Sequence, residues 1–528
     1  MLYYLSYIIL ICFNIIKNKK ALHVLQQNLY NTNNRYIKWL NKNKKKIFLN
    51  LELLAFLLII LSFLLKKHIV FIIISLIIYI LEGLYLCVLN KLDKVKINLV
   101  VTKRLIRLIV TLSIIYLLPL FLNLFNFLNN NLMILILSIL TYISYIMVWV
   151  ATIINIPVEK FVYKFYECKA LKKLKDLRNL TVIGITGSYG KTSSKNVLNE
   201  ILNEKYIAKP TPKNFNTEYG MMITINNYLD KFDEYLIAEM GAYTKGEIKR
   251  LCDMVHPKYG IITTIGLAHL ESFGSEDNII ETKFELIESL PADGIGVLNG
   301  DDPKQVNYQI KNNCKKVWIG ILNTNVDYYA TNIKCSHKGV RFDLNIKNDN
   351  NVYPFETKLL GNHNIYNVLA AIALGKELGM SISELQRGVK KVKPVESRLE
   401  LRNYGYMYQI NDAYNSNPVG AKEALNVLKL MPGIKFVVTP GMTELGNKEN
   451  EINEEFGKQI SEVADYVILV GEKRTDAIYR GIINNKFGKD KIFIVNSVFE
   501  AYNILQNYKT DQELYALFEN DLPDIYNE

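Results

Sequence analysis

The sequence predicts a bundle of transmembrane helices followed by two α/β domains. Five long apolar stretches occupy the first 157 of the 528 residues. From about residue 179, short apolar runs alternate with helical stretches, which is typical of a parallel sheet with helical crossovers. A break near Pro394 precedes a second alternating segment. We therefore expect a membrane domain at 1–157, a central domain at 158–395 and a C-terminal domain at 396–528.

The apolar stretches are each close to the ~20 residues that a helix needs to cross a bilayer. They lie at about 2–16, 47–65, 69–90, 105–128 and 132–156. Residues 1–157 carry 17 lysines and arginines against three acidic residues, and most of the basic residues fall in alternate loops. Basic loops stay in the cytoplasm. We expect about five spans in a lipid bilayer, a multi-pass protein of the cell membrane, and catalytic domains in the cytoplasm. Buried core helices of a soluble domain are the alternative.

Three charged residues lie in or near the predicted spans, namely Glu52, Glu82 and Arg107. A charge within a bilayer is a hint of function. Long charged side chains at helix ends can instead reach the water interface. We expect these three residues at helix ends, which leaves a transport pathway with little support.

Charge and cysteine usage exclude two classes of protein. Outside residues 1–157, 46 basic and 48 acidic residues almost balance. A nucleic-acid-binding domain needs a basic face, so we expect no nucleic-acid partner. The six cysteines are scattered without a C-x-x-C pair, which argues against a zinc ribbon or a disulfide framework.

The central domain is predicted to hold a phosphate-binding loop and a mostly parallel sheet. Strands are predicted at 181–186, 235–240, 259–266 and 294–300. Residues 316–360 alternate polar and apolar side chains and predict a small antiparallel patch, followed by a helix at 364–379. Strands at 435–440, 466–471 and 491–496 predict a smaller, Rossmann-like C-terminal domain.

The strongest functional signal is the run Thr186-Gly187-Ser188-Tyr189-Gly190-Lys191-Thr192, between a predicted strand and a predicted helix. A glycine turn before a helix directs backbone N–H groups at phosphate. Lys191 can reach the terminal phosphates, and the Thr192 hydroxyl can bind Mg²⁺. The strict G-x-x-x-x-G-K-[ST] pattern is not met, because Ile185 stands where its first glycine belongs. The context still predicts a nucleoside triphosphate site.

Three further residues occupy positions that suit a metal site. Glu239 ends a predicted strand, where a carboxylate in a phosphate-loop protein can hold a metal. His269 follows the strand at 259–266, and Lys283 lies on a predicted helix. Taken singly, His269 and Lys283 are more often ordinary structural or surface residues.

Ten motifs in a fixed order resemble the Mur ligase family of ATP-dependent enzymes that form peptide bonds. They span about residues 180–528 and read GITGSYGKTSSK, NFNTEYG, EMGAYTKGEI, IGLAHLESFGS, ETKFELI, LNGDD, GNHNIYNVLAA, SRLE, NDAYNSNP and PGMTELG. The family's phosphate loop is TGxxGKT, which removes the mismatch at Ile185. The EMGA, GEI and TELG pieces are most similar to the branch that adds D-alanyl-D-alanine to a cell-wall tripeptide.

The resemblance implies ATP, two Mg²⁺ ions and roles for particular residues. Lys191 would hold the β- and γ-phosphates, and Thr192 and Glu239 would bind the first Mg²⁺. His269 would help to bind the second, and Lys283 matches the family's carbamoylated lysine. The matches to nucleotide contacts are Asn299, Asn364, Arg398 and Asp412. The matches to the loop that lines the substrate carboxylate are Asn214, Asn216 and Thr217.

The implied reaction is amide-bond formation through an acyl phosphate, with Lys191, His269 and Lys283 as the catalytic residues. Their charges would neutralise the transferring phosphoryl group. The expected partners are a cell-wall precursor peptide and an amino acid or dipeptide amine. Apolar helices stand where this family has its UDP-sugar-binding domain, which leaves the acceptor open. The alternatives are a Mur-fold ligase for another amino acid or glutamate, a transporter, and a non-catalytic membrane scaffold.

Overall fold

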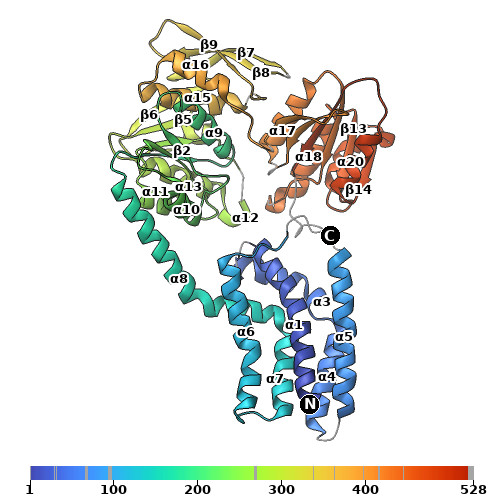
Figure 1. The fold of residues 1–528 in the computed structure, drawn as a ribbon. Helices are drawn as coiled ribbons and strands as arrows, with labels where there is room; N and C mark the ends of the chain where they lie inside the picture. Colours follow the sequence, from blue (N-terminus) through green and yellow to red (C-terminus); the bar gives the residue numbers. More distant parts are fainter. Residues whose placement is uncertain are drawn as a thin grey trace. The chain divides into compact units, whose positions relative to one another are not determined.

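The chain divides into two compact units, one running from the N-terminus to Lys164 and one starting at Phe165. The computed structural model describes residues 2–28, 30, 32–65, 69–92, 98–266, 270–336, 338–361, 363–396, 398–413, 417–443 and 445–520. The described residues of the first unit form helices, and both sheets belong to the second unit (Figure 1). Each unit is built around its own apolar core.

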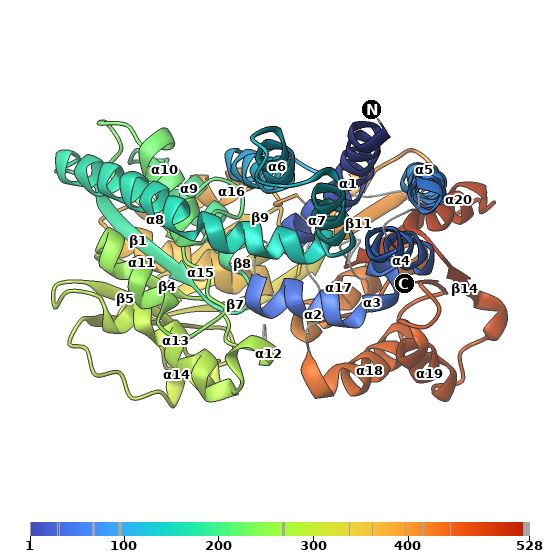
Figure 2. The same ribbon diagram turned by 90° about the horizontal axis from the view of Figure 1, so that it is seen from below.

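The first unit is a bundle of antiparallel helices. Its elements are α1 (Leu2–Gln27), the π-helical turn Thr32–Tyr36, α2 (Ile37–Lys42), α3 (Lys44–Ile47), α4 (Asn50–Leu64), α5 (Ile69–Leu92), α6 (Lys103–Leu124), α7 (Asn130–Tyr142) and the first part of α8 (Ser144–Asp176), which continues into the second unit after Lys164. Seen from below in Figure 2, α1, α4, α5, α6 and α7 lie side by side. Leu10, Leu25, Leu105 and Met133 meet in the core of this bundle.

The lengths of these helices correct the expected number of spans. Among the described residues, three helical segments are long and apolar enough to cross a membrane, judged by length and composition alone: Ile69–Leu89, Lys103–Leu124 and Ser144–Asp176. α4 and α7 are apolar but have only 15 and 13 residues. The apolar stretch at 132–156 is not one helix, because α7 ends at Tyr142 and α8 begins at Ser144. Uninterrupted apolar sequence therefore did not mean an uninterrupted helix.

Glu52 lies in the first turn of α4, at a helix end as expected, but its side chain is buried in the bundle and does not face water. Glu82 was also expected at a helix end, but it lies within α5 and is buried. The Lys17 ammonium donates hydrogen bonds of 2.7 and 2.8 Å to the two carboxylate oxygens of Glu52. The side chains of Lys17 and Glu52 are 3% and 0% exposed. Arg107 is also paired, through two hydrogen bonds of 2.7 and 2.9 Å to Glu159. The bundle thus encloses an ion pair between Lys17 of α1 and Glu52 of α4. Burying either of these two charges without its partner would be costly.

Removing one partner of this pair is expected to destabilise the bundle strongly. Lys17→Met should leave the Glu52 carboxylate buried without a counter-charge, at a cost of about 3–5 kcal/mol. Hydrogen exchange of the amides of α1 and α4 measures this loss. Lys19→Met, at an exposed position on the same helix, is the matched control, and Lys17→Met/Glu52→Gln should recover part of the loss. Unchanged exchange in Lys17→Met would show that the pair does not stabilise the bundle.

The second unit begins with a nine-stranded sheet in the order β2-β3-β1-β4-β5-β6-β7-β8-β9. The strands are β1 (Thr181–Thr186), β2 (Ala208–Pro210), β3 (Tyr235–Glu239), β4 (Tyr259–Ile262), β5 (Ile295–Asn299), β6 (Lys315–Gly320), β7 (Tyr328–Ser336), β8 (Gly339–Ile346) and β9 (Val352–Thr357). Pairing is parallel from β2 to β7 and antiparallel from β7 to β9. The predicted antiparallel patch is thus present, as an extension of the parallel sheet.

Helices cover both faces of this sheet because its central strands are apolar on both sides. The helices are α9 (Lys191–Leu202), α10 (Glu218–Tyr228), α11 (Glu247–Val255), α12 (Leu270–Phe273), α13 (Glu276–Glu288), α14 (Pro303–Val306), α15 (His363–Glu377) and α16 (Ile382–Lys391). Ile183 and Ile185 of β1 pack in one core with α9, α15 and α16. Gly184, between them, faces Leu286 of α13 on the opposite side. This is the two-sided burial expected of parallel strands.

A second sheet of six strands follows, in the order β10-β11-β15-β12-β13-β14. Its strands are β10 (Glu400–Asn403), β11 (Tyr408–Asp412), β12 (Ile434–Thr439), β13 (Tyr466–Val470), β14 (Ile492–Val495) and β15 (Leu514–Glu519), with helices α17 (Pro418–Lys429), α18 (Glu449–Ser461), α19 (Asp476–Asn484) and α20 (Val498–Asn507). The two short 3₁₀ helices are Gly446–Lys448 and Lys489–Lys491. All pairs are parallel except β10 with β11. Parallel strands with helical connections are the expected Rossmann-like arrangement.

Candidate functional site

The candidate site lies at the carboxyl end of β1, where the order of strands reverses. β1 pairs with β3 on one side and with β4 on the other, although β3 and β4 both follow it in the chain. Such a reversal opens a crevice at the carboxyl edge of a parallel sheet, and ligands bind there. The loop after β1 is the predicted phosphate loop, and Glu239 is the last residue of β3.

The phosphate loop is held in a fixed conformation by its neighbours. The Thr186 hydroxyl donates to Met240 O at 2.9 Å, and the Ser188 hydroxyl donates to Gly266 O at 2.8 Å. The Tyr189 carbonyl accepts a hydrogen bond of 2.5 Å from the Thr263 hydroxyl. Gly190 has φ = 80° and caps the N-terminus of α9, a backbone conformation that a side chain would disfavour. The loop therefore presents the first N–H groups of α9 at the crevice, as an anion site requires.

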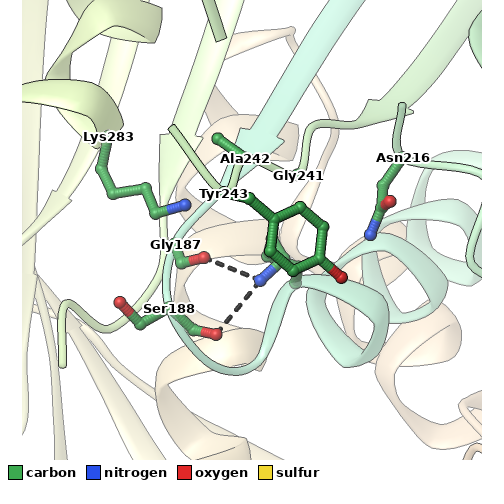
Figure 3. A pocket seen from close by; sticks show the side chains of 8 residues that line it. Gly187, Ser188, Asn216, Gly241, Ala242, Tyr243 and Lys283 are labelled. Atoms are coloured by element: carbon green, nitrogen blue, oxygen red, sulfur yellow. Dashed lines mark hydrogen bonds between the residues drawn. The ribbon is translucent and has the colours of Figure 1, made fainter. Parts of the chain in front are cut away.

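Lys191 folds back over this loop. Its ammonium donates to Gly187 O at 2.7 Å and to Ser188 O at 3.1 Å, the two contacts drawn as dashed lines in Figure 3. Burial lowers its pKa to about 8, and the nearby Glu239 carboxylate opposes this shift. The ammonium is therefore mostly charged at pH 7 and lies beside the N-terminus of α9, where a phosphate would bind.

Glu239 is a buried carboxylate with a defined orientation. Asn216 Nδ2 donates to its Oε1 at 3.1 Å, and the Lys195 ammonium lies 2.9 Å from its Oε2. Burial opposes its ionisation, but the charges of Lys195 and Lys191 outweigh burial and lower its pKa. Glu239 is therefore an ionised group at the bottom of the crevice.

Lys283 faces the same pocket from α13. The pocket is lined by Gly187, Ser188, Lys191, Asn216, Gly241, Ala242, Tyr243 and Lys283 (Figure 3). The Lys283 side chain is buried, with its ammonium 5.7 Å from the centre of the Phe273 ring. Burial, with the Lys191 charge in addition, lowers the pKa of Lys283 to about 7. Two amines thus share one pocket, and Lys283 is about half neutral at pH 7.

The residues present fit one Mg²⁺ ion that takes part of its coordination shell from a bound phosphate. Glu239 Oε2 is buried, and the Lys195 ammonium lies 2.9 Å from it as an ion-pair partner. Mg²⁺ in such sites takes one or two protein oxygens and completes its shell with water and phosphate. Thr192 is the second residue of α9 and could add a hydroxyl. Among the described residues no three His, Cys, Asp or Glu side chains gather as a metal cluster, so a closed protein cage is not present there.

Several predicted residues lie outside this pocket. Asn214 and Thr217 belong to the loop before α10 and are exposed, and the Thr217 hydroxyl caps α10 by accepting from Gly220 N at 3.3 Å. Of the three residues predicted to line the substrate carboxylate, Asn216 is therefore the one in the pocket. Thr192 does not line it either. His269 lies outside the described residues.

The predicted nucleotide contacts are spread over both sheets. Asn299 ends β5 and accepts a hydrogen bond of 2.9 Å from Asp301 N. Asn364 lies in the first turn of α15 and donates to Leu360 O at 2.8 Å. Asp412 ends β11 of the second sheet, and Arg398 lies two residues before β10. Leu399 N donates to the Asp412 carboxylate at 3.2 Å. Burial raises the pKa of Asp412 to about 6, and the Arg398 charge opposes the rise.

Three residues near the pocket were not predicted as site residues. Lys195 contacts Glu239, and its spacing of four residues from Lys191 puts it on the same side of α9. Asn367 accepts a hydrogen bond of 2.7 Å from Ser194 and donates to Asn364 at 3.0 Å, which links α15 to α9. Tyr243 follows β3 and lines the pocket. The i, i+4 spacing of Lys191 and Lys195 was a usable signal; a single aromatic residue after a strand was not.

Comparison with known proteins identifies the family. The Mur ligase middle domain matches residues 185–375, and the Mur ligase glutamate ligase domain matches residues 397–514. UDP-N-acetylmuramoyl-tripeptide–D-alanyl-D-alanine ligase of Bacillus subtilis is 34% identical over 332 residues, which are 62% of this chain and 70% of that enzyme. The chain belongs to the Mur ligase family. The predicted resemblance and the predicted class of enzyme, an ATP-dependent amide ligase, are confirmed.

Other Mur ligases support the same assignment. The Escherichia coli ligase of the same name is 31% identical over 55% of this chain and 65% of its own length. The solved structure of the MurF ligase from Thermotoga maritima in complex with ADP has a TM-score of 0.60 and 26% identity, over 69% of this chain and 81% of that one. The predicted fold of the two α/β domains is therefore confirmed. The apolar helices of residues 2–164 lie outside both matched family domains.

The same comparison contradicts the predicted localisation. We expected a multi-pass protein of the cell membrane with its catalytic domains in the cytoplasm and a lipid bilayer as a partner. The related ligases are soluble cytoplasmic proteins and not multi-pass membrane proteins. The three described helices that are long and apolar enough to cross a membrane meet that criterion by length and composition alone, and they do not outweigh the comparison. The membrane localisation was predicted from the length of the apolar stretches. Such a length shows that a helix can lie in apolar surroundings, but it does not show whether lipid or protein surrounds the helix.

Proposed function

We propose that this Mur ligase joins D-alanyl-D-alanine, or an amine of similar structure, to the terminal carboxylate of a cell-wall tripeptide precursor, with ATP as the source of energy. The observation that carries this proposal is the meeting of Lys191, Lys283 and Asn216 in one pocket, with Glu239 behind them. The named relatives act on a UDP-N-acetylmuramoyl tripeptide and D-alanyl-D-alanine. The 34% identity to one of them supports the same substrates here.

The reaction follows from the charges around the pocket. A carboxylate oxygen of the acceptor attacks the γ-phosphorus, the bond from that phosphorus to the bridging oxygen breaks, and ADP leaves with the electron pair. The amine nitrogen then attacks the acyl carbon, phosphate leaves with the C–O electron pair, and the amine loses a proton. Negative charge accumulates on the phosphoryl oxygens during the first step, and Lys191 is placed to neutralise it.

Mg²⁺ would supply a further positive charge at the phosphoryl group and is expected to bind at Glu239 and Thr192. Asn216 would orient both the carboxylate of Glu239 and the acceptor, since its amide reaches Glu239 from the pocket wall. Lys283 would carry a carbamate, and His269 would bind a second Mg²⁺. The central domain, at 158–395, would hold ATP through contacts that include Asn299 and Asn364, and the C-terminal domain is the remainder at 396–528. The C-terminal domain would bring Arg398 and Asp412 to the nucleotide.

The proposal is tested by ADP release from the purified full chain. UDP-N-acetylmuramoyl tripeptide and D-alanyl-D-alanine together are expected to release ADP and to yield a product heavier than the tripeptide by one dipeptide less one water. Omitting either substrate should reduce ADP release to background. The same assay is run with D-alanine, L-alanine and L-glutamate in place of the dipeptide.

The assays with D-alanine, L-alanine and L-glutamate separate the competing functions. Ligation of glutamate or a single amino acid, with none of the dipeptide, would assign the chain to a Mur ligase with another substrate. Nucleotide binding without ADP release for any amine would indicate a non-catalytic role. Either result would overturn the proposed substrate.

A further inference from the structure

We infer that Lys195 is a positioning residue, which holds the Glu239 carboxylate and the loop that carries Asn216 in register with the phosphate loop. The inference deepens the proposed function, because it concerns the same pocket. Lys195 does not line the pocket, so it would act through Glu239 and Asn216 and not on the substrate itself.

Lys195 is a buried lysine in an unusual position. It lies one turn after Lys191 on α9, and its side chain is 2% exposed. A buried ammonium is stable only where charges and acceptors surround it. Here it lies 2.9 Å from Glu239 Oε2 and donates a hydrogen bond to the backbone carbonyl of Lys213. Both contacts are long-range in sequence, so this one group joins α9 to the end of β3 and to the loop at 211–217.

The Asn216 amide closes a ring of contacts with Lys195. Asn216 Nδ2 donates to Glu239 Oε1 at 3.1 Å, on the side of the carboxylate opposite to Lys195. Asn216 O accepts a hydrogen bond of 2.7 Å from Gly241 N. A Cβ on Gly241 would lie 2.8 Å from Asn216 Cγ, so Gly241 is the residue that lets this side chain fit. The loop at 211–217 is therefore tied to the sheet at Asn216 and to α9 at Lys213.

These contacts predict what the loss of Lys195 does. Without the ammonium, the Glu239 carboxylate can rotate about its last bond, and the Lys213 carbonyl loses its donor. Asn216 would then shift relative to the phosphate loop. The phosphate loop itself is held by hydrogen bonds of Thr186, Ser188 and Thr263, and Lys195 takes part in none of these three bonds. The nucleotide site should therefore survive, and the acceptor site should not.

The experiment compares Lys195→Met with Lys195→Arg in the full chain. Lys195→Met is expected to raise KM for the acceptor at least tenfold and to lower kcat, while the Kd for ADP stays within about threefold of wild type. Lys195→Arg, which keeps the positive charge, should recover a measurable part of both losses. Lys205→Met, an exposed lysine beyond the end of α9, is the matched control and should behave as wild type.

A double-mutant cycle with Asn216→Leu tests the coupling. If Lys195 acts through Glu239 and Asn216, the double variant should be no more than about threefold worse than the worse single variant. Independent, multiplicative losses would overturn the inference, and so would wild-type kinetics in Lys195→Met. A parallel loss of ADP binding and of thermal stability would also overturn it, by showing a general role in folding. The cycle uses whichever amine the chain ligates, so failure of D-alanyl-D-alanine as a substrate leaves this test intact.

Discussion

Replacing Lys191 with alanine is expected to lower the rate of ligation by about 100- to 1000-fold, the usual loss when one group that stabilises a transition-state charge is removed. The ammonium of Lys191 lies over the phosphate loop, bonded to Gly187 O and Ser188 O. This ammonium is mostly charged at pH 7 and can stay close to the γ-phosphate while negative charge accumulates on the phosphoryl oxygens. ADP release at saturating substrates measures the loss in kcat.

The stability of the Lys191→Ala variant separates catalysis from folding. Burial lowers the pKa of Lys191 to about 8 in the folded state. Between about pH 8 and pH 10.5 this lysine is therefore protonated to a smaller fraction in the folded state than in the unfolded state. Wild-type stability should therefore rise with pH across this window, and the variant should lose that rise. Lys209→Ala, at an exposed position of β2, is the matched control with full activity expected. Unchanged turnover in Lys191→Ala would remove Lys191 from the mechanism.

The order of strands and helices in the α/β region could be predicted because its signals are local. Apolar runs bounded by glycine or polar residues predicted β1, β3, β5, β12, β13 and β14 to within about one or two residues. β2 was missed, because three residues (Ala208–Pro210) are too few to show a pattern. β15 (Leu514–Glu519) was also missed, although all six of its residues are buried. Its place between β11 and β12 depends on pairing across the whole domain, which local sequence does not reveal.

The candidate site could be predicted where a residue ends a strand or caps a helix. Lys191 and Glu239 follow β1 and end β3, and parallel strands bring their carboxyl ends together. Lys283 lies in mid-helix, where an exposed lysine is the usual case, and it was selected only through the family motif ETKFELI. Lys195 lay in a quoted motif but was not selected. Its spacing of four residues from Lys191 places both on one side of α9, and the fold adds that Lys195 is buried there against Glu239.

The paired charges of the helical unit were misjudged for a related reason. The sequence shows Lys17 and Glu52 35 residues apart and in different helices, so nothing local predicts their contact. Glu52 was expected at a helix end, with its side chain reaching the water interface. The pair is buried because the two charges compensate each other, which is a property of the packed helices α1 and α4 and not of either segment.

Lys283→Ala is expected to lower the ligation rate by about 100- to 1000-fold, because in the proposed function Lys283 carries a carbamate whose negative charge the variant would lack. Lys283 and Lys191 share one pocket, and burial lowers the pKa of Lys283 to about 7. Two ammonium groups there would repel each other. The neutral amine would add to CO₂ and release one proton, which leaves a carbamate with one negative charge. That charge would attract Lys191, and the carbamate oxygens would be ligands for Mg²⁺. Formate or acetate should restore part of the activity of Lys283→Ala by occupying the same space.

The carbamate itself has a direct readout. With ¹³C-labelled bicarbonate, the wild-type chain is expected to show one carbamate resonance that Lys283→Ala lacks, and Lys249→Ala, an exposed lysine on α11, should keep it. Only the neutral amine reacts with CO₂, and with a pKa of about 7 its share falls from about nine-tenths at pH 8 to about one-tenth at pH 6. The resonance should therefore fade as the pH falls through 7. A full resonance at pH 6, or its persistence in Lys283→Ala, would assign the carbamate to another amine and leave Lys283 as a plain cation of the pocket.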